Sequence, residues 1–311
     1  MLERKKRQAE VDKNFKNPDF PRRAHWILDL FIQLFKTKPL GLFGGILVIS
    51  MLVVAILAPL IAPFDPSTQH GLKTLQPPGR VFFFGTDSLA RDLFSRVIYG
   101  ARISLYVGLG AVSLSLLIAV TIGLLSGYLG GTFDTIIQRI VDAFMAFPWL
   151  VIMLTVMAIL GPGIKNVILA MAFATFSGNS RVIRGAVLSV KESEYVMAAR
   201  LIGCKHWMIV LRYILPNIAA PIIVIGSLSL GHAILLEATL SFLGFGVPPP
   251  APSWGRMLSG EGMEYMLQAP WLPLFPGLAI SIAVFGFNML GDALRDLLDP
   301  KLAGGFRGGT Q

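Results

Sequence analysis

Five long charge-free stretches limit most strongly what this chain can fold into. Each runs for 22 to 31 residues without Asp, Glu, Lys or Arg. They occupy residues 40–64, 103–133, 143–164, 213–236 and 265–291. A helix needs about 20 apolar residues to cross a bilayer, so each stretch is long enough for a transmembrane helix. Water-soluble core helices would explain one such stretch, but not five.

A sixth stretch, 166–190, is apolar but contains Arg181 and Arg184. Arginines near the end of a transmembrane helix can extend their guanidinium groups to the lipid headgroups. The composition agrees with a membrane protein, because 14% of the 311 residues are charged, against about 25% in an average soluble domain. We therefore expect an all-α integral membrane protein with six transmembrane helices.

The placement of the basic residues predicts the topology. With six alternating spans and the N-terminus inside, 20 of the 27 Lys and Arg residues fall on the inner side. The positive-inside rule then places both termini in the cytoplasm. The net charge of +9 is spread along one membrane face, which argues against a nucleic-acid partner. The single cysteine, Cys204, excludes a disulfide-stapled fold.

The same pattern divides the chain into segments. The predicted segments are a cytoplasmic tail with an interfacial helix (1–39), the first span (40–64), an external loop (65–102), a core of five spans (103–300) that includes a cytoplasmic loop (189–212), and a C-terminal tail (301–311). The interfacial helix is expected because apolar residues recur at helical spacing from Trp26 to Phe35 between basic residues.

The two longer external segments carry local predictions. In the first, Thr86 or Asp87 is expected to cap a short helix. Two acid–base pairs spaced four residues apart are expected to join along that helix: Asp87 with Arg91, and Asp92 with Arg96. In the second, the prolines of 246–255 force an extended path, and Trp254 is expected at the membrane interface.

The chain carries little that could perform chemistry or drive transport. No phosphate-binding Gly-x-x-x-x-Gly-Lys-Ser/Thr motif occurs, and the four histidines are too dispersed for a metal site. The five clean spans contain no Asp, Glu, Lys or Arg, and ion-driven carriers usually need some of these near mid-membrane. We therefore expect no catalytic residue, metal or cofactor in this chain, and an energy source on other chains.

Small residues and one acid mark positions inside the predicted bundle. Gly123, Gly127 and Gly131 recur every four residues, a spacing that lets another helix approach closely. Glu237 lies about 33 Å along the helix from Leu215, near the outer face. It is expected either to line or close a pathway or to form a structural hydrogen bond.

The most informative segment is cytoplasmic. Residues 194–203 predict a short helix that ends at Gly203. Tyr195, Ala199 and Gly203 are expected on one face, with Glu194 and Ala198 beside them. Small residues on an exposed helix allow it to insert into a cleft of another protein, and an ordinary loop between spans is the simpler alternative. Pro216 is expected at the start of the fifth span, where its missing N–H costs little.

This segment resembles the EAA loop of ABC importer permeases, in which Glu-Ala-Ala, three residues, Gly and nine residues precede Ile-x-Leu-Pro. The matching residues are Ala198, Ala199, Gly203, Leu215 and Pro216. Met197 stands where the pattern has Glu, and Tyr213 where it has Ile. The peptide-importer version of the loop, whose acid comes three residues earlier, is closer still and adds Glu194, Tyr195 and Arg200.

Three more regions resemble the C-type permease subunit of the same group. They are 85–105, 240–255 and 288–300, so the resemblance covers about 26–300 in one register. It implies a MetI-like permease core with an extra N-terminal span. It also implies the cytoplasmic (inner) membrane of a bacterium or archaeon as the location.

The resemblance implies a heteromeric importer of dipeptides or oligopeptides. The implied partners are a homologous second permease, two cytoplasmic ATPase subunits that bind ATP and Mg²⁺, and an external substrate-binding protein. The implied ATPase-coupling residues are Glu194, Tyr195, Ala198, Ala199, Arg200, Gly203, Leu215 and Pro216. Permeases for nickel, glutathione or another small solute share these motifs. A self-sufficient channel or secondary carrier is the alternative from a different class.

Overall fold

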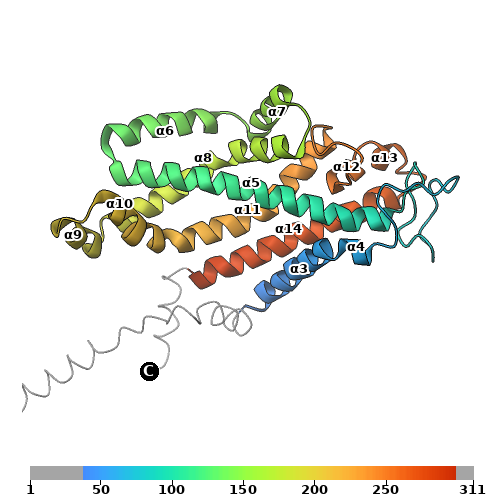
Figure 1. Cartoon of the computed structure of the whole chain (residues 1–311), viewed down its shortest axis with the longest axis horizontal. Helices are drawn as coiled ribbons and strands as arrows, with labels where there is room; N and C mark the ends of the chain where they lie inside the picture. The colour runs from blue at the N-terminus through green and yellow to red at the C-terminus, as the bar shows by residue number, and fades with distance from the viewer. Residues whose placement is uncertain (1–37, 299–311) are drawn as a thin grey trace, which may run out of the picture. The chain divides into compact units, whose positions relative to one another are not determined.

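The computed structural model describes residues 38–298. Its helical elements in chain order are α3 (Pro39–Ile56), α4 (Ala58–Ile61), α5 (Leu93–Leu129), α6 (Gly131–Ala146), α7 (Trp149–Leu160), α8 (Ile164–Lys191), α9 (Glu194–Leu201), α10 (His206–Met208), η1 (Ile209–Ile214), η2 (Leu215–Ile218), α11 (Ala219–Phe242), α12 (Trp254–Leu258), α13 (Glu261–Glu264) and α14 (Trp271–Leu298) (Figure 1). Within these residues the only extended pairing is two isolated β-bridges, so the predicted all-α fold is confirmed there. The predicted tails, 1–39 and 301–311, lie outside the described residues except for residues 38 and 39.

Within residues 38–298, four continuous helices are long and apolar enough to cross a membrane. They are α3, α5, the rod His206–Phe242 and α14. They coincide with the first, second, fifth and sixth predicted spans. A fifth crossing exists if α6 and α7 are taken together as one bent span.

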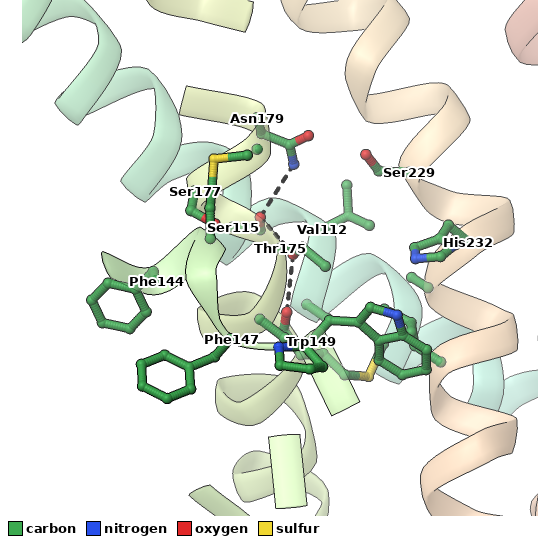
Figure 2. Close-up of a pocket in the computed structure, with 18 residues that line it drawn as sticks. Val112, Ser115, Phe144, Phe147, Trp149, Thr175, Ser177, Asn179, Ser229 and His232 are labelled. Carbon is green, nitrogen blue, oxygen red and sulfur yellow. Dashed lines mark hydrogen bonds between the residues drawn. The ribbon is translucent and has the colours of Figure 1, made fainter. Parts of the chain in front are cut away.

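The third predicted span, 143–164, is not one helix. It covers the end of α6 and all of α7, which are bent by 90°. Phe147 and Pro148 separate them with extended backbone, ψ 140° and 134°. Proline has no N–H to continue a helix and disfavours helical geometry in the residue before it. The bend brings Phe147 and Trp149 to the rim of a cavity (Figure 2).

Helix α8 covers the sixth predicted stretch. Its 28 residues correspond to about 42 Å of helix, which is enough to cross a bilayer. It contains Lys165, Arg181, Arg184 and Lys191, and it is not among the helices apolar enough to be candidate spans, so the predicted sixth span is not confirmed. Val167 and Met171 are buried among residues of α5 and α7. Neighbouring helices therefore shield much of α8 from its surroundings.

The fifth span begins earlier than predicted, at His206 rather than near Pro216. Pro216 lies in the 3₁₀ segment η2, directly after the π-helical turn η1. A proline inside a helix removes one backbone hydrogen bond and crowds the preceding turn. The local change from α to π and 3₁₀ winding accommodates both effects. His206–Phe242 is therefore one helical rod with an irregularity at Pro216.

Close packing of α5 on α8 confirms two of the three predicted glycine positions. A Cβ at Gly123 would lie 2.9 Å from the carbonyl oxygen of Ser180, and one at Gly127 would lie 2.9 Å from Val187 Cγ1. Gly131 takes no part in this contact. It begins α6 with φ +57°, and no described atom lies within 4 Å of a Cβ built on it.

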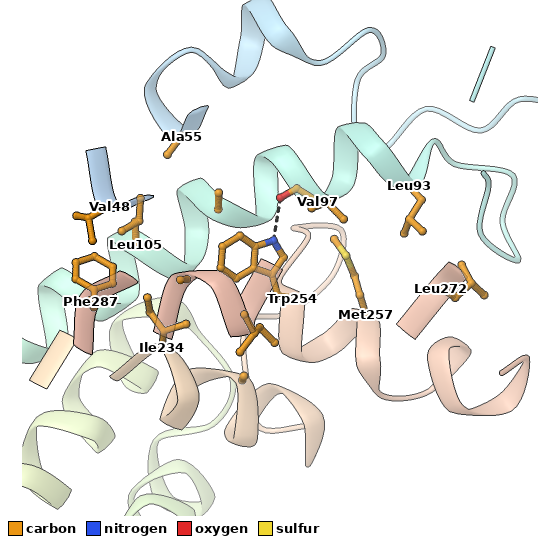
Figure 3. Packing of buried hydrophobic residues seen from close by; sticks show 14 of the residues in the cluster. Val48, Ala55, Leu93, Val97, Leu105, Ile234, Trp254, Met257, Leu272 and Phe287 are labelled. Atoms are coloured by element: carbon orange, nitrogen blue, oxygen red, sulfur yellow. Dashed lines mark hydrogen bonds between the residues drawn. The ribbon is translucent and has the colours of Figure 1, made fainter. Parts of the chain in front are cut away.

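Trp254 lies in the core, not at the membrane interface as predicted. Its side chain is 3% exposed, and its Nε1 donates to the carbonyl oxygen of Val97 at 2.9 Å (Figure 3). The indole lies against Gly100 of α5, where a Cβ would be 2.7 Å from the ring. When the indole N–H has a hydrogen-bond partner, burying the whole ring is more favourable than leaving it partly exposed to water at an interface. Trp254 thus joins α12 to the start of α5.

The short helix predicted in the loop 65–102 is absent. Residues 85–92 are not helical, and α5 itself begins at Leu93. Asp92 is the N-cap of α5, because its Oδ2 accepts a hydrogen bond from the backbone N–H of Ser95 at 2.8 Å. A helix cap does occur in this loop, as predicted, but the capping residue is Asp92 and the helix that it caps is the 37-residue α5.

Capping also changes the predicted ion pairs. Asp87 pairs with Arg91 at 2.6 Å, as predicted. Arg96 pairs with Asp87 at 3.5 Å and not with Asp92, whose Oδ2 is occupied by the cap. Arg91 also contacts Glu261 at 3.1 Å. These pairs hold the loop before α5 against α13.

Candidate functional site

The segment 189–212 forms a hairpin at one end of the helix bundle (Figure 1). Helix α9 is the short helix that the sequence predicts. Gly203 follows it with φ +78°, a left-handed conformation that favours glycine. The backbone N–H of Cys204 donates to the carbonyl oxygen of Ala199 at 3.0 Å and closes the turn. The chain then returns through α10 into the rod of the fifth span.

One side of α9 packs inside the chain. Val196 and Ala199 are buried and belong to a cluster with Ile209 and Ile214 of η1. Ala199 therefore lies inward, whereas Tyr195, four residues before it on the same helix, is exposed. The following segment η1 covers the side of α9 that carries Val196 and Ala199. The helical periodicity of α9 alone could not predict this burial, because the covering residues come from another element.

The other side of α9 and the following turn expose large apolar side chains. Leu201 is 88% exposed and Ile202 is 77% exposed. We name this region the hairpin surface and define it as Tyr195, Met197, Leu201, Ile202 and Trp207, all of which are exposed. Of the remaining resemblance residues, Glu194, Ala198, Arg200, Gly203 and Pro216 are exposed, and Leu215 is half-buried.

Tyr128, at the end of α5, holds the hairpin in place. Its hydroxyl lies 2.7 Å from His206 Nδ1. The Arg200 guanidinium and the Lys191 ammonium lie 5.7 and 5.9 Å from the centre of its ring. These distances suit cation–π attraction. Tyr128 was not predicted as a site residue, because its only signal in the sequence is an aromatic hydroxyl near the end of an otherwise apolar stretch.

Asp134 joins α6 to α5 and α8 at the same end of the bundle. Its carboxylate accepts a hydrogen bond from Arg184 Nε at 2.7 Å and a short one from the Ser126 hydroxyl. Further along the same two helices, Asp142 of α6 pairs with Arg181 of α8. The two arginines that seemed to reach for headgroups are therefore paired with carboxylates of α6.

Glu237 is fully buried between α11 and α5. Its Oε2 accepts from the Ser104 hydroxyl at 3.2 Å, and its Oε1 accepts from the Ser241 hydroxyl at 2.7 Å. This is the geometry of a structural hydrogen-bond network, one of the two roles predicted for it. The neighbouring Leu236 lines the cavity described next, whereas Glu237 does not.

A cavity of about 410 Å³ lies between the middle of α5, α8 and α11 and the bend between α6 and α7 (Figure 2). Its polar lining includes Ser115, Thr175, Asn179, Ser229 and His232. The aromatic side chains of its wall are Phe144, Phe147 and Trp149. None of the described residues that line it is Asp, Glu, Lys or Arg.

Comparison with solved structures defines the class of the fold. A chain of the MetNI methionine ABC transporter, in inward-facing conformations, superposes with a TM-score of 0.54. The match covers 66% of this chain and 96% of that chain at 16% sequence identity. The bundle therefore shares its fold with this chain of an ABC transporter.

Comparison of sequences then gives the family. Residues 119–304 match the family model described as "Binding-protein-dependent transport system inner membrane component", and residues 28–78 match the "N-terminal TM domain of oligopeptide transport permease C". The chain belongs to this family of binding-protein-dependent permeases, and the resemblance noted from the EAA-like loop is confirmed.

Curated relatives match most of the chain. The dipeptide transport system permease protein DppC of Alkalihalophilus pseudofirmus is 43% identical, over 88% of this chain and 90% of the relative. The oligopeptide transport system permease protein OppC of Bacillus subtilis is 41% identical, over 86% and 88%. The glutathione transport system permease protein GsiD of Pectobacterium atrosepticum is 40% identical, over 88% and 90%.

Proposed function

We propose that this chain is the permease subunit of an ATP-driven ABC importer of dipeptides or oligopeptides. It forms half of the translocation pathway beside a homologous second permease. The observation that carries this proposal is the match, over nearly the whole chain, to relatives named for dipeptide and oligopeptide transport. The chain itself catalyses nothing and holds no cofactor. Partner subunits bind ATP and Mg²⁺, and an external binding protein delivers the solute.

The proposal includes six spans in the cytoplasmic membrane, with both termini in the cytoplasm. Helices α5 and α8 run in the same direction, since Gly110 faces Ile168 and Gly127 faces Val187. The chain between two parallel neighbours must return across the bundle, and α6 with α7 provides that return. Counting this bent pair and α8 with the four continuous helices gives six crossings.

Uptake by the whole complex tests the proposed function. The complex is purified through a tag on this chain, reconstituted in liposomes with its binding protein, and supplied with labelled tri-alanine. We expect uptake that requires ATP hydrolysis on the side of the hairpin. Uptake that persists with a non-hydrolysable ATP analogue would contradict the proposal and favour a self-sufficient carrier.

Glutathione is a second candidate solute, because a relative named for glutathione transport is 40% identical to this chain. Glutathione is itself a small peptide, so both solutes present amide groups to the pathway. Unlabelled glutathione and Ni²⁺ are therefore included as competitors in the uptake measurement. Strong competition by glutathione but not by other peptides would favour this second candidate.

The hairpin surface is proposed to dock in a cleft of one ATPase subunit. Large apolar side chains exposed at the end of a helical hairpin favour burial against a partner. Leu201→Asp is expected to reduce co-purification of the ATPase, because it places a charge within this apolar contact. Leu72→Asp is the matched control, since Leu72 is also fully exposed but lies in the loop 65–102. Equal ATPase recovery from both variants would contradict the docking assignment.

A further inference from the structure

The cavity beside the α6–α7 bend holds polar groups that the fold does not use. Asn179 Nδ2 and the Thr175 hydroxyl contact the Ser115 hydroxyl at 3.4 and 2.8 Å (Figure 2). These contacts leave the carbonyl oxygen of Asn179 without a partner among the described residues. Ser229 and His232 of α11 line the same cavity, and their side chains form no hydrogen bond with residues 38–298.

The lining of this cavity is mostly apolar, and its polar groups belong to residues other than Asp, Glu, Lys and Arg. A wall of fixed charges would hold the ammonium or carboxylate end of a peptide tightly. A transport pathway needs binding that is strong enough for entry and weak enough for release. The amide N–H and C=O groups of a peptide backbone are neutral, and they are the same in every sequence. The free groups of Asn179, Ser229 and His232 offer matching donors and acceptors.

An aromatic wall completes the cavity. Trp149 is the first residue of α7, and its indole packs edge-on against the His232 ring, with ring centroids 6.4 Å apart. It is 40% exposed, so part of the ring remains available for contact. The volume of about 410 Å³ lies within the range of about 300–1,000 Å³ typical of small-molecule sites. The same lining does not suit a bare divalent metal ion, because it offers one imidazole and no carboxylate or thiolate.

We propose that this cavity is a contact site for the peptide backbone during translocation, and that Asn179 and Ser229 bind its amide groups through neutral hydrogen bonds. The site lies midway along α5, α8 and α11, which places it at mid-depth of the proposed membrane crossing. It contacts the part of the solute that all peptides share, and it leaves side-chain selection to the external binding protein. This inference rests on the proposed function.

Uptake by the whole reconstituted importer tests the site. The double variant Asn179→Ala with Ser229→Ala is expected to lower the ratio kcat/KM for labelled tri-alanine about tenfold, since it removes two hydrogen-bonding groups. Assembly of the complex and its ATP hydrolysis are expected to stay unchanged. Ser227→Ala is the matched control, because Ser227 lies on α11 outside the cavity and its hydroxyl is bonded to the Val224 carbonyl at 2.9 Å.

A change of selectivity separates solute contact from a merely structural defect. Ser229→Asp is expected to slow uptake of Ala-Glu-Ala relative to Ala-Lys-Ala about tenfold, because it adds a negative charge to the site. Ser227→Asp is expected to leave that ratio unchanged. If Ser229→Asp does not assemble, the double alanine variant decides the question.

The outcomes distinguish this inference from the proposed function. Absence of ATP-dependent uptake of all three peptides by the unmodified importer would refute the proposed function and the site with it. Normal uptake by the unmodified importer, with the rate and selectivity retained in the cavity variants, would leave the proposed function standing and overturn the site.

Discussion

Tyr128 contributes to the hairpin through two separable contacts, a hydroxyl bond to His206 and a ring beneath Arg200 and Lys191. Tyr128→Phe removes only the first and is expected to cost about 0.5–1.5 kcal/mol of local stability. Tyr128→Leu removes both and is expected to cost more, since each cation–π contact adds about 0.5–1 kcal/mol. Hydrogen exchange of the α9 amides measures this order, and equal protection in the two variants would show that the ring contributes nothing.

Glu237 allows its structural role to be separated from a role in transport. Glu237→Gln keeps the size of the side chain, and its amide can still bond to Ser104 and Ser241, so little stability should be lost. Glu237→Ala leaves two buried hydroxyls unpaired and empties a buried position, at a cost of about 2–5 kcal/mol. Thermal unfolding of the detergent-solubilised protein measures both. An alanine variant with unchanged Tm but no peptide uptake would instead identify Glu237 as a pathway residue.

Single residues were predictable from sequence where one chemical requirement decides the position. Gly203 terminates α9 as expected, because the turn needs a left-handed conformation. Trp254 was misplaced because an indole suits both an interface and a core, and only the facing Gly100 and Val97 decide between them. The burial of Ala199 could not be predicted either, since the chain that covers it comes from the next element.

At the scale of elements, the contact between α5 and α8 depends on the absence of two side chains. Gly123→Ala places a Cβ 2.9 Å from the Ser180 carbonyl oxygen and 3.0 Å from the Arg184 backbone nitrogen. Because backbone atoms of α8 cannot move aside cheaply, we expect a loss of about 1–3 kcal/mol. Gly185→Ala on α8 is the matched control, since no described atom lies within 4 Å of its Cβ and alanine favours a helix. Similar Tm values for both variants would contradict the packing argument.

Most spans were predictable from sequence because hydrophobic length is a local property. Helices α3, α5 and α14 appear where charge-free stretches lie. The bend at Pro148 and the irregular winding at Pro216 were not predicted, because apolarity is the same in straight, bent and rewound helices. The cavity was not predictable at all, since five helices (α5, α6, α7, α8 and α11) supply its wall and their packing cannot be read from apolar length.

At the scale of the whole molecule, the direction of the helices places the hairpin and the loop 62–92 at opposite ends of the helix bundle. The hairpin joins the end of α8 to the rod that leads into α11, whereas the loop 62–92 joins α4 to the start of α5. Since α5 and α8 run parallel, these two connections lie at opposite ends of the bundle. The proposed ATPase contact and the proposed external loop are therefore compatible in one topology.

Cysteine labelling tests that topology directly. Cys204 is the single cysteine, so Cys204→Ser gives an unlabelled background into which one new cysteine is placed. Leu72 and Leu201 are 101% and 88% exposed, so a thiol at either position is accessible to reagents on its own side. In spheroplasts, a membrane-impermeant maleimide is expected to label Leu72→Cys at once and Leu201→Cys only after the membrane is permeabilised. If only Leu201→Cys is labelled in intact spheroplasts, the predicted orientation is the wrong way round. If Leu72→Cys and Leu201→Cys are both labelled in intact spheroplasts, the two positions do not lie on opposite sides of the membrane. Either result would also remove the hairpin surface from the reach of a cytoplasmic ATPase, because the docking proposal requires Leu201 on the inner side.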